Sequence, residues 1–477
     1  MFETGIRQFR MAMGMVRGRR LDTGNLARLV DDARKTIAEF GEPGMDVQQI
    51  VDGPAGDPGA REHFATQGIR RTAARLAAES PFYARRFAAA GVDPAKLRPG
   101  GLGAIPVTTK ADLIDRQDEF RCAGTARHLA TRTTGTTGRP AEIWLSRYEI
   151  ELWPALIALS AVLTDELRTS DVMQVNISSR QTAAVHLNAA SCRLAGAACR
   201  VLGVVPVDEA LDALADGGST LLSASPSYLA ELVLGARRRG MGPGDFRLRG
   251  IQAGGEVLSP SVAAAVSETF GVERVGDNFG MTEVIPMSAR ACRQGHLHHD
   301  INLGLVEYLD LETSAPAEPG ALATLVMTPF FPYRDCMPVF RYDTRDVVRM
   351  LPEEPLTCEL SAMPATTHLL GKAGHLLRTG SGDLVTPRQL VEAVEGLPTR
   401  PWPARFRASV HNGRLRLTLP AGAVDGFGEA AARAHFAEAG LDVALEIVPD
   451  GQAISLRHVR SDLHETTFSA RPALIGA

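Results

Sequence analysis

The first part of the chain has apolar and polar residues at helical spacing. Residues 1–65 follow this pattern around a break rich in Gly, Pro and Asp at residues 52–59, which indicates a loop. The helical pattern resumes at residue 66 and ends at Gly91. We therefore expect residues 1–65 to form a helical extension in front of a larger domain.

Short apolar runs alternate with helical segments through the middle of the chain. The strand-length runs cover residues 171–178, 199–207 and 219–225. This alternation is typical of an α/β architecture with a largely parallel sheet. Residues 321–350 differ, because their two longer runs indicate antiparallel strands in a small β-rich subdomain.

The C-terminal part of the chain has a third pattern. Asn412 and Gly413 separate two alternating apolar runs, which predicts a β-hairpin, and a helix and another strand follow. With a boundary near Gly371, we expect two folded domains. Residues 66–371 would form a large domain of mixed, mainly parallel sheets with helices, and residues 372–477 a small mobile α+β domain.

Composition narrows the classes of protein that fit. The chain has 45% hydrophobic residues, 22% charged residues and a net charge of −4, which suits a globular protein and disfavours nucleic acid as a partner. The longest apolar run, residues 152–164, is shorter than the roughly 20 residues of a membrane span. Six cysteines do not indicate a disulfide scaffold, and the start lacks a secretory signal, so we expect a cytoplasmic protein without a membrane partner.

Small hydroxyl residues and glycines alternate between Thr131 and Pro140. Glycine lets the backbone approach a ligand closely, and backbone N–H groups with hydroxyls can surround phosphate oxygens. The segment is not a Walker loop, because a Gly-Lys-Ser/Thr sequence is missing from it. It is either a phosphate-binding loop or a plain polar loop between strands.

Three later segments give this loop a context. They are Gly254–Glu256, Asp277–Glu283 with the sequence DNFGMTE, and Phe340–Asp346 with the sequence FRYDTRD. In this order and spacing, and together with PFY at 81–83 and PVTTKADL at 106–113, they resemble the adenylate-forming superfamily of acyl-CoA ligases, luciferases and adenylation domains. Within it the chain resembles the phenylacetate-CoA ligase group, over roughly residues 66–390.

The resemblance implies a nucleotide site. Thr282 would contact the α-phosphate, Glu283 would bind Mg²⁺, which prefers hard oxygen ligands, and Asp346 would bind the ribose hydroxyls. The mobile phosphate loop would consist of Thr133, Thr134, Gly135, Thr136, Thr137 and Gly138. The other residues expected at the nucleotide are Gly255, Glu256, Asp277, Asn278, Phe279, Gly280, Met281 and Lys372, and Gly254 would border the acyl pocket.

Each of these residues also has a plain structural interpretation. Glu283 is then a carboxylate at a helix start, Asp346 a surface acid at a strand end, and Phe279 a core residue. Lys110 is expected to close a surface turn.

The implied reaction is ATP-dependent activation of a small, aromatic carboxylic acid. The carboxylate attacks the α-phosphorus, pyrophosphate leaves, and acyl-AMP forms, so the enzyme must align the nucleophile and neutralise phosphate charge. Thr134, Thr282 and Glu283 would act in this step. The acyl group would then pass to CoA.

Two departures from the resemblance leave the acceptor open. Related proteins have a lysine near the C-terminus, and here the segment holds Arg457 as the catalytic candidate, with His458 and Arg460 nearby. The hinge has Lys372 in the place of an arginine. These changes leave an amine, nitrite or a carrier-protein thiol as alternative acceptors. The alternative functions are a ligase that forms an amide or activates an unusual oxyacid, such as nitrite to modify an aryl amine, and a non-catalytic relative.

Four residues form a candidate zinc site, Cys292, His298, Cys336 and Cys358, in line with the resemblance. The alternative is scattered buried cysteines that pack as small apolar residues. His296 and His299 are expected to be exposed or near the acyl pocket.

The segment 176–188 falls where relatives line the acyl pocket. It offers Asn176, Arg180, His186 and Asn188, so the acid either carries polar substituents, or these side chains cap helices and satisfy buried backbone groups. The N-terminal extension is either a dimer contact, which would make a homodimer, or a lid.

Overall fold

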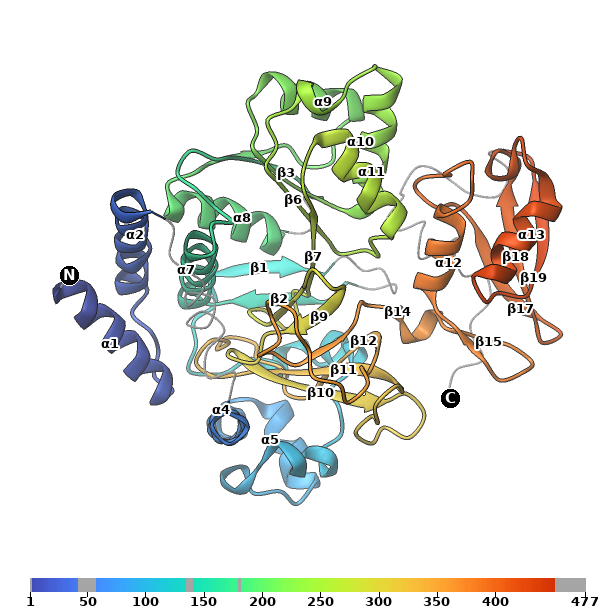
Figure 1. The fold of residues 1–477 in the computed structure, drawn as a ribbon. Helices are drawn as coiled ribbons and strands as arrows, with labels where there is room; N and C mark the ends of the chain where they lie inside the picture. Colours follow the sequence, from blue (N-terminus) through green and yellow to red (C-terminus); the bar gives the residue numbers. More distant parts are fainter. Residues whose placement is uncertain (1, 42–56, 134–139, 179–181, 451–477) are drawn as a thin grey trace.

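A computed structural model of the chain describes residues 2–41, 57–133, 140–178 and 182–450. It confirms the predicted α/β class, with one large sheet, several small sheets and helices around them (Figure 1). The expected phosphate-loop residues Thr134, Gly135, Thr136, Thr137 and Gly138, together with Arg180 and Arg457, lie outside the described residues.

The large sheet has the strand order β13-β9-β8-β7-β6-β5-β3-β4. Strands β4, β3, β5, β6 and β7 run parallel, as the alternating pattern predicts, and β8, β9 and β13 are antiparallel. The strands are β3 (Val172–Asn176), β4 (Ala198–Val201), β5 (Leu221–Ala224), β6 (Gly250–Gly254), β7 (Val275–Gly280), β8 (Ser288–Ala291), β9 (His296–His299) and β13 (Ala365–Thr367).

Helices cover both faces of this sheet. Successive side chains of a strand point to opposite faces, so Leu221 packs with α7 and α8, whereas Leu222 packs with α9, α10 and α11. Figure 1 shows these two groups of helices on either side of the strands. The helices are α7 (Arg147–Leu163), α8 (Thr182–Ala195), α9 (Val207–Asp216), α10 (Pro226–Arg238) and α11 (Pro260–Phe270).

The N-terminal part is helical, as expected from its periodicity. Helix α2 (Thr23–Phe40) packs against α7 and α8, and the backbone N–H of Leu21 donates to Tyr148 Oη at 2.9 Å. The other α-helices that the structure describes before β1 are α1 (Phe2–Val16), α4 (Pro58–Glu79), α5 (Pro81–Ala89) and α6 (Lys110–Asp115). Within the described residues, the structure contains no helix that is long and apolar enough to cross a membrane.

The predicted antiparallel strands of residues 321–350 form part of a second sheet, with the order β10-β11-β12-β14. A separate hairpin is formed by β1 and β2, which flank the glycine-rich segment in the sequence. The strands are β1 (Leu129–Arg132), β2 (Glu142–Leu145), β10 (Gly304–Asp310), β11 (Leu322–Pro329), β12 (Tyr342–Arg349) and β14 (Gly371–Lys372).

The C-terminal part has its own apolar core and the predicted hairpin. His411 pairs with Arg414 across Asn412 and Gly413, which have φ of 49° and 75°, so a two-residue turn joins β17 and β18. Strand β19 adds in parallel to β18. The elements are β15 (Leu377–Arg378), β16 (Leu384–Val385), α12 (Pro387–Glu395), β17 (Arg407–His411), β18 (Arg414–Pro420), α13 (Gly428–Glu438) and β19 (Val443–Val448).

Candidate active site

A cavity of about 3080 Å³ lies at the carboxyl ends of β6 and β7 and is also lined by β12 and β14. In a parallel sheet this is where ligands are expected, because the loops there are free to diverge. The cavity brings together expected residues from segments far apart in sequence. They are Thr133, Gly254, Gly255, Glu256, Asp277, Asn278, Phe279, Gly280, Met281, Thr282, Glu283, Asp346 and Lys372.

Glu283 lies at the edge of this cavity and its side chain is 4% exposed. It accepts a hydrogen bond of 3.4 Å from Tyr342 Oη, and Lys110 Nζ lies 4.0 Å away. Lys110 was expected at a surface turn, and that expectation is wrong. The residue starts α6, which Thr109 caps, and its side chain lines the cavity, where burial lowers its pKa against the opposing effect of Glu283.

Asp346 and Lys372 form an ion pair within the same cavity. The two residues are directly opposite each other on β12 and β14, and Lys372 Nζ lies 2.7 Å from Asp346 Oδ2. Burial raises the pKa of Asp346, and the ammonium of Lys372 opposes that shift. The carboxylate is thus held by a cation on one side and faces the cavity on the other.

Thr133, the first residue of the glycine-rich loop, directly follows β1. Thr133 is buried, and it exchanges two hydrogen bonds of 3.0 Å with the backbone of Ala141, one from its own N–H and one to its hydroxyl. These bonds fix the start of the loop at the cavity wall.

Two glycines let the strand ends approach each other at the nucleotide motifs. A Cβ on Gly254 would lie 3.0 Å from the carbonyl oxygen of Asn278 on the neighbouring strand, and Gly255 has φ of 84°. A larger residue at either position would strain the backbone. Beside them, His368 Nδ1 lies 3.1 Å from Asp277 Oδ2.

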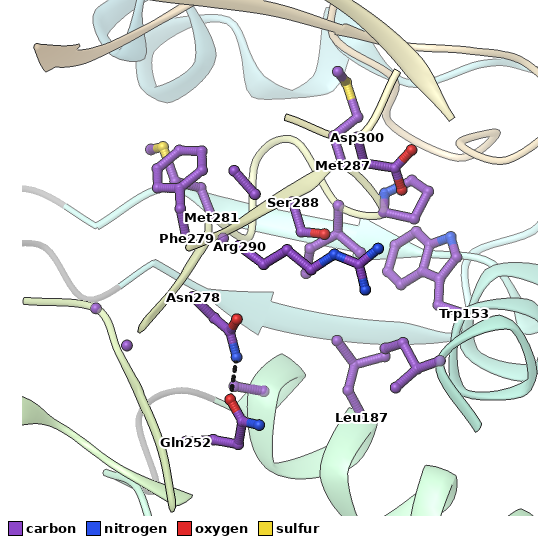
Figure 2. Close-up of a pocket in the computed structure, with 18 of the residues that line it drawn as sticks. Trp153, Leu187, Gln252, Asn278, Phe279, Met281, Met287, Ser288, Arg290 and Asp300 are labelled. Atoms are coloured by element: carbon purple, nitrogen blue, oxygen red, sulfur yellow. Dashed lines mark hydrogen bonds between the residues drawn. The ribbon is translucent and has the colours of Figure 1, made fainter. Parts of the chain in front are cut away.

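Figure 2 draws the cavity from the end of β7, with Asn278 and Phe279, to Trp153 on the other side, and we call the part next to Trp153 the acyl end. Trp153 of α7 and Leu187 of α8 form apolar walls, and Met287 lies beyond them. The polar side chains there are Ser288, Arg290 and Asp300. Phe279 is only 6% exposed and belongs both to the core and to the lining of the cavity.

The polar residues expected in the acyl pocket are held by protein groups. Asn176 is buried and donates to Gly203 O at 2.8 Å, His186 Nε2 lies 3.1 Å from Ile150 O, and Asn188 donates to Ala184 O at 2.9 Å. Asn176 and Asn188 also line the cavity. Their hydrogen bonds agree with the plain structural interpretation, in which they satisfy backbone groups.

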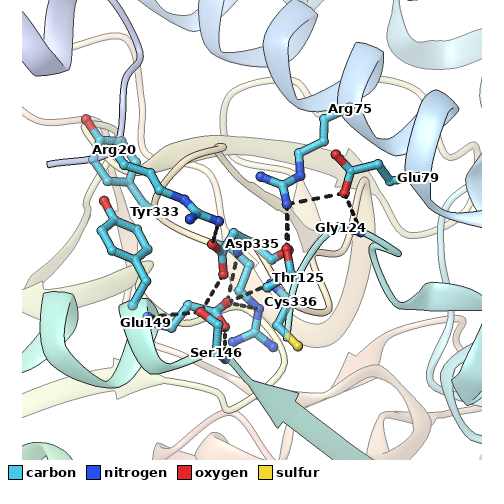
Figure 3. Close-up of polar contacts among 12 residues, drawn as sticks. Arg20, Arg75, Glu79, Gly124, Thr125, Ser146, Glu149, Tyr333, Asp335 and Cys336 are labelled. Carbon is cyan, nitrogen blue, oxygen red and sulfur yellow. Dashed lines mark hydrogen bonds and ion pairs between the residues drawn. The ribbon is translucent and has the colours of Figure 1, made fainter. Parts of the chain in front are cut away.

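A polar network around Glu149 and Asp335 (Figure 3) lies next to Trp153, because Tyr333 of the same segment accepts a hydrogen bond from the indole. Trp153 Nε1 donates to Tyr333 O at 2.7 Å, and the Arg334 guanidinium lies 5.3 Å from its ring centroid. Glu149, which is buried, accepts from Asp335 N at 2.9 Å, and Asp335 pairs with Arg20 of the N-terminal extension at 2.5 Å. The extension therefore contacts this network through the Arg20 side chain.

Two cysteines and two histidines cluster beside the acyl end. Their ligand atoms lie within 4.8 Å of one another, and the members are Cys292, His296, His298 and Cys358. Cys358 Sγ lies 3.2 Å from His298 Nε2, while His298 Nδ1 lies 3.2 Å from Met363 O, an arrangement that orients a metal-binding imidazole. Buried His296 Nδ1 lacks a hydrogen-bond partner among the described residues. This donor set fits a tetrahedral zinc ion.

The expectation for Cys336 was wrong. Its backbone N–H contacts Glu149 and its carbonyl accepts from Cys122, so it belongs to the network of Figure 3 and not to the cluster. His296, expected to be exposed or at the acyl pocket, takes its place, because the β8–β9 turn brings it next to Cys292. His299 is fully buried and bonds to Thr366.

Sequence reasoning did not single out several residues of the cavity. Ser288, Arg290 and Asp300 lie outside the recognised motifs, and pairing of β7, β8 and β9 brings them to the cavity. Lys110 could have been identified from the sequence, because it is one of only four lysines and stands in the PVTTKADL segment at 106–113.

Comparison with known proteins adds relatives to this geometry. No family model matches the sequence. The phenylacetate-coenzyme A ligase of Thermus thermophilus is 28% identical over 61% of this chain and 65% of its own length. That of Aromatoleum evansii is 26% identical over 57% of this chain and 62% of its own length. The chain thus matches less than two thirds of the length of these relatives.

Solved structures share the fold. A 2-hydroxyisobutyryl-CoA ligase in complex with 2-HIB-AMP superposes with a TM-score of 0.71, at 17% identity, over 83% of this chain and 88% of that one. An anthranilate CoA ligase in complex with anthranoyl-AMP gives a TM-score of 0.52, at 16% identity, over 67% of this chain and 62% of that one. The sequence relatives support a resemblance to phenylacetate-coenzyme A ligases of the adenylate-forming superfamily, and the solved structures share the fold of this chain.

Proposed function

We propose that this protein is an ATP-dependent, AMP-forming ligase that activates a small carboxylic acid and transfers the acyl group to CoA. The observation that carries the proposal is the meeting of Glu283, Asp346 and the start of the glycine-rich loop in one cavity with an apolar extension. The names of the sequence relatives, and the acyl-AMP in the structural neighbours, support the same reaction class.

The charged residues of the cavity have different roles in this proposal. Asp346 provides carboxylate oxygens for the ribose hydroxyls, and Lys372, 2.7 Å away, holds that carboxylate in place. The ammonium of Lys110, next to Glu283, is a second cation besides Lys372 and would lie near the phosphates. Glu283 would hold Mg²⁺, and a bound Mg²⁺ ion neutralises charge on the phosphate oxygens. The apolar walls would position the acid in line with the α-phosphorus.

The test is pyrophosphate release with ATP and Mg²⁺ over a panel of aromatic and short-chain acids. CoA, amines and nitrite are added in separate arms. Release that needs an acid, with an acyl-CoA product in the CoA arm, is the expected result. Pyrophosphate release only in the amine or nitrite arm would reject CoA as the acceptor, and ATP binding without any release would reject adenylation.

We infer further that Cys292, His296, His298 and Cys358 hold a structural zinc ion. The four donors are soft or borderline ligands, and all four side chains come from the protein, so the coordination is closed. The purified protein should contain about one zinc ion per chain by mass spectrometry. Cys358→Ser should lose it, whereas the matched variant Cys336→Ser should keep it; equal zinc content in both variants would contradict the assignment.

A further inference from the structure

Arg290 is a charged residue in the apolar part of the cavity. It lies on β8, where it pairs with Asn278 of β7 on one side and with His298 of β9 on the other. Cross-strand neighbours share a face of the sheet, so Arg290 faces the same cavity as the nucleotide motif residue Asn278. It is half-buried and lines that cavity.

Figure 2 shows the Arg290 side chain extending across the acyl end, with its guanidinium directed toward Trp153 and with Ser288 on one side and Leu187 on the other. A ligand that occupies the space between the nucleotide motifs and Trp153 must therefore pass beside the guanidinium. An acid with an anionic oxygen group on its far side would meet further N–H donors of the guanidinium there, besides the interaction that Arg290 already makes within the protein.

We propose that Arg290 determines acid specificity, by binding a second carboxylate or a comparable anionic oxygen group at the far end of a planar acid. This inference rests on the proposed function and adds the substrate class to it. The guanidinium presents a planar fork of N–H donors that matches a carboxylate, and its five donors let it bind a ligand in addition to protein partners. Trp153 and Leu187 provide the apolar surface for the ring of such an acid.

Other charged and titratable groups near Arg290 define the competing possibility. Asp300 also lines the acyl end, next to Ser288 through the hydrogen bond from Asp300 N to Ser288 O at 3.0 Å, and His298 is the neighbour on β9. An acid with an amino substituent would use Asp300 instead. Arg290 projects further into the space between the apolar walls in Figure 2, so we favour the anionic substituent.

The test compares benzoate with two acids that add one group at position 3 of the same ring, 3-carboxybenzoate and 3-aminobenzoate. Each is measured by calorimetric binding to the protein and by pyrophosphate release with ATP and Mg²⁺. The variants are Arg290→Gln, Arg290→Lys and Asp300→Asn. The matched control is Arg293→Gln, which removes the same charge from an exposed side chain outside the cavity lining. Thermal melting verifies that each variant is folded.

We expect 3-carboxybenzoate to bind at least about 10-fold more tightly than benzoate, which is the scale of one good charged contact. Arg290→Gln should remove that preference while benzoate binding changes less than about threefold, and Arg290→Lys should restore part of it. An equal loss for all acids, no preference in the native protein, or a preference for 3-aminobenzoate that Asp300→Asn removes would each overturn the proposal. If the preference is found without any pyrophosphate release, the specificity stands and the adenylation proposal fails.

Discussion

The two ends of the cavity are assembled in different ways. At the nucleotide end, residues 277–283 supply one continuous segment of the lining, and Thr133, residues 254–256 and the Asp346–Lys372 pair add to it from other motifs of the sequence. At the acyl end, Trp153, Leu187 and Arg290 come from three separate elements. The first end is thus built from motifs that the sequence itself shows, whereas the residues of the second end belong to no motif and are brought together by packing of helices on strands. Substitutions at one end should therefore leave the other end intact.

The largest expected effect is at the nucleotide end, from Glu283→Gln. We expect pyrophosphate release to fall about 100-fold or more, near 2.7 kcal/mol, because the variant keeps the shape of the side chain and loses the anionic metal ligand. Calorimetric binding of the acid should stay within about threefold. Steady-state kinetics give the measurement, and activity within threefold of the native protein would exclude Glu283 from the reaction.

Helix α12 packs next to the nucleotide end, and we expect its contribution to the free energy of unfolding to depend on pH. On this helix Arg388 donates to Leu258 O at 3.0 Å, and burial raises the pKa of Glu395 to about 7. A raised pKa in the folded state means that the protonated carboxyl stabilises the fold at low pH, and that this contribution is lost between about pH 4.5 and 7.

The slope is at most about 1.4 kcal/mol per pH unit. Relative to Glu395→Gln, the native protein should therefore lose stability as the pH rises through this window and stay level above it. Denaturant titrations at several pH values measure the difference. A difference that does not vary with pH would show that Glu395 titrates normally.

At the acyl end, Leu187→Ala tests whether acid preference can change without a change at the nucleotide end. Removing this wall should shift the relative kcat/KM toward bulkier acids by about 10-fold, the scale of a few methylene groups in an apolar pocket. The KM for ATP should stay the same, because Leu187 lies on α8, away from the nucleotide motifs. A parallel rise in the KM for ATP would indicate that the two ends are coupled.

The smallest effect concerns the backbone beside Asp346. Arg345 has φ of 60°, a left-handed conformation that favours glycine. Arg345→Gly should leave the free energy of unfolding unchanged or raise it by less than about 1 kcal/mol, whereas Arg345→Val should lower it by about 1–2 kcal/mol. Equal melting temperatures for the two variants would show that the backbone at residue 345 is not strained.

Periodicity and turn residues predicted the regular elements well. The runs at 171–178 and 219–225 became parallel strands, and the Asn412–Gly413 turn formed where predicted. These features depend on neighbours in sequence, so one chain suffices to find them. The zinc ligands illustrate the limit, because Cys336 has the right chemistry and the wrong location, and His296 joins Cys292 through the turn between two strands.

For this protein the sequence by itself determined the α/β class, the hairpins and the segments that carry the nucleotide motifs, because each depends on local spacing and on residue chemistry. The tertiary structure alone decided that Lys110 points to Glu283 and that Arg290 lies opposite Trp153. These contacts join residues far apart in the chain. They follow from which face of the sheet each strand residue occupies and from which helix covers it, and no local pattern encodes that pairing.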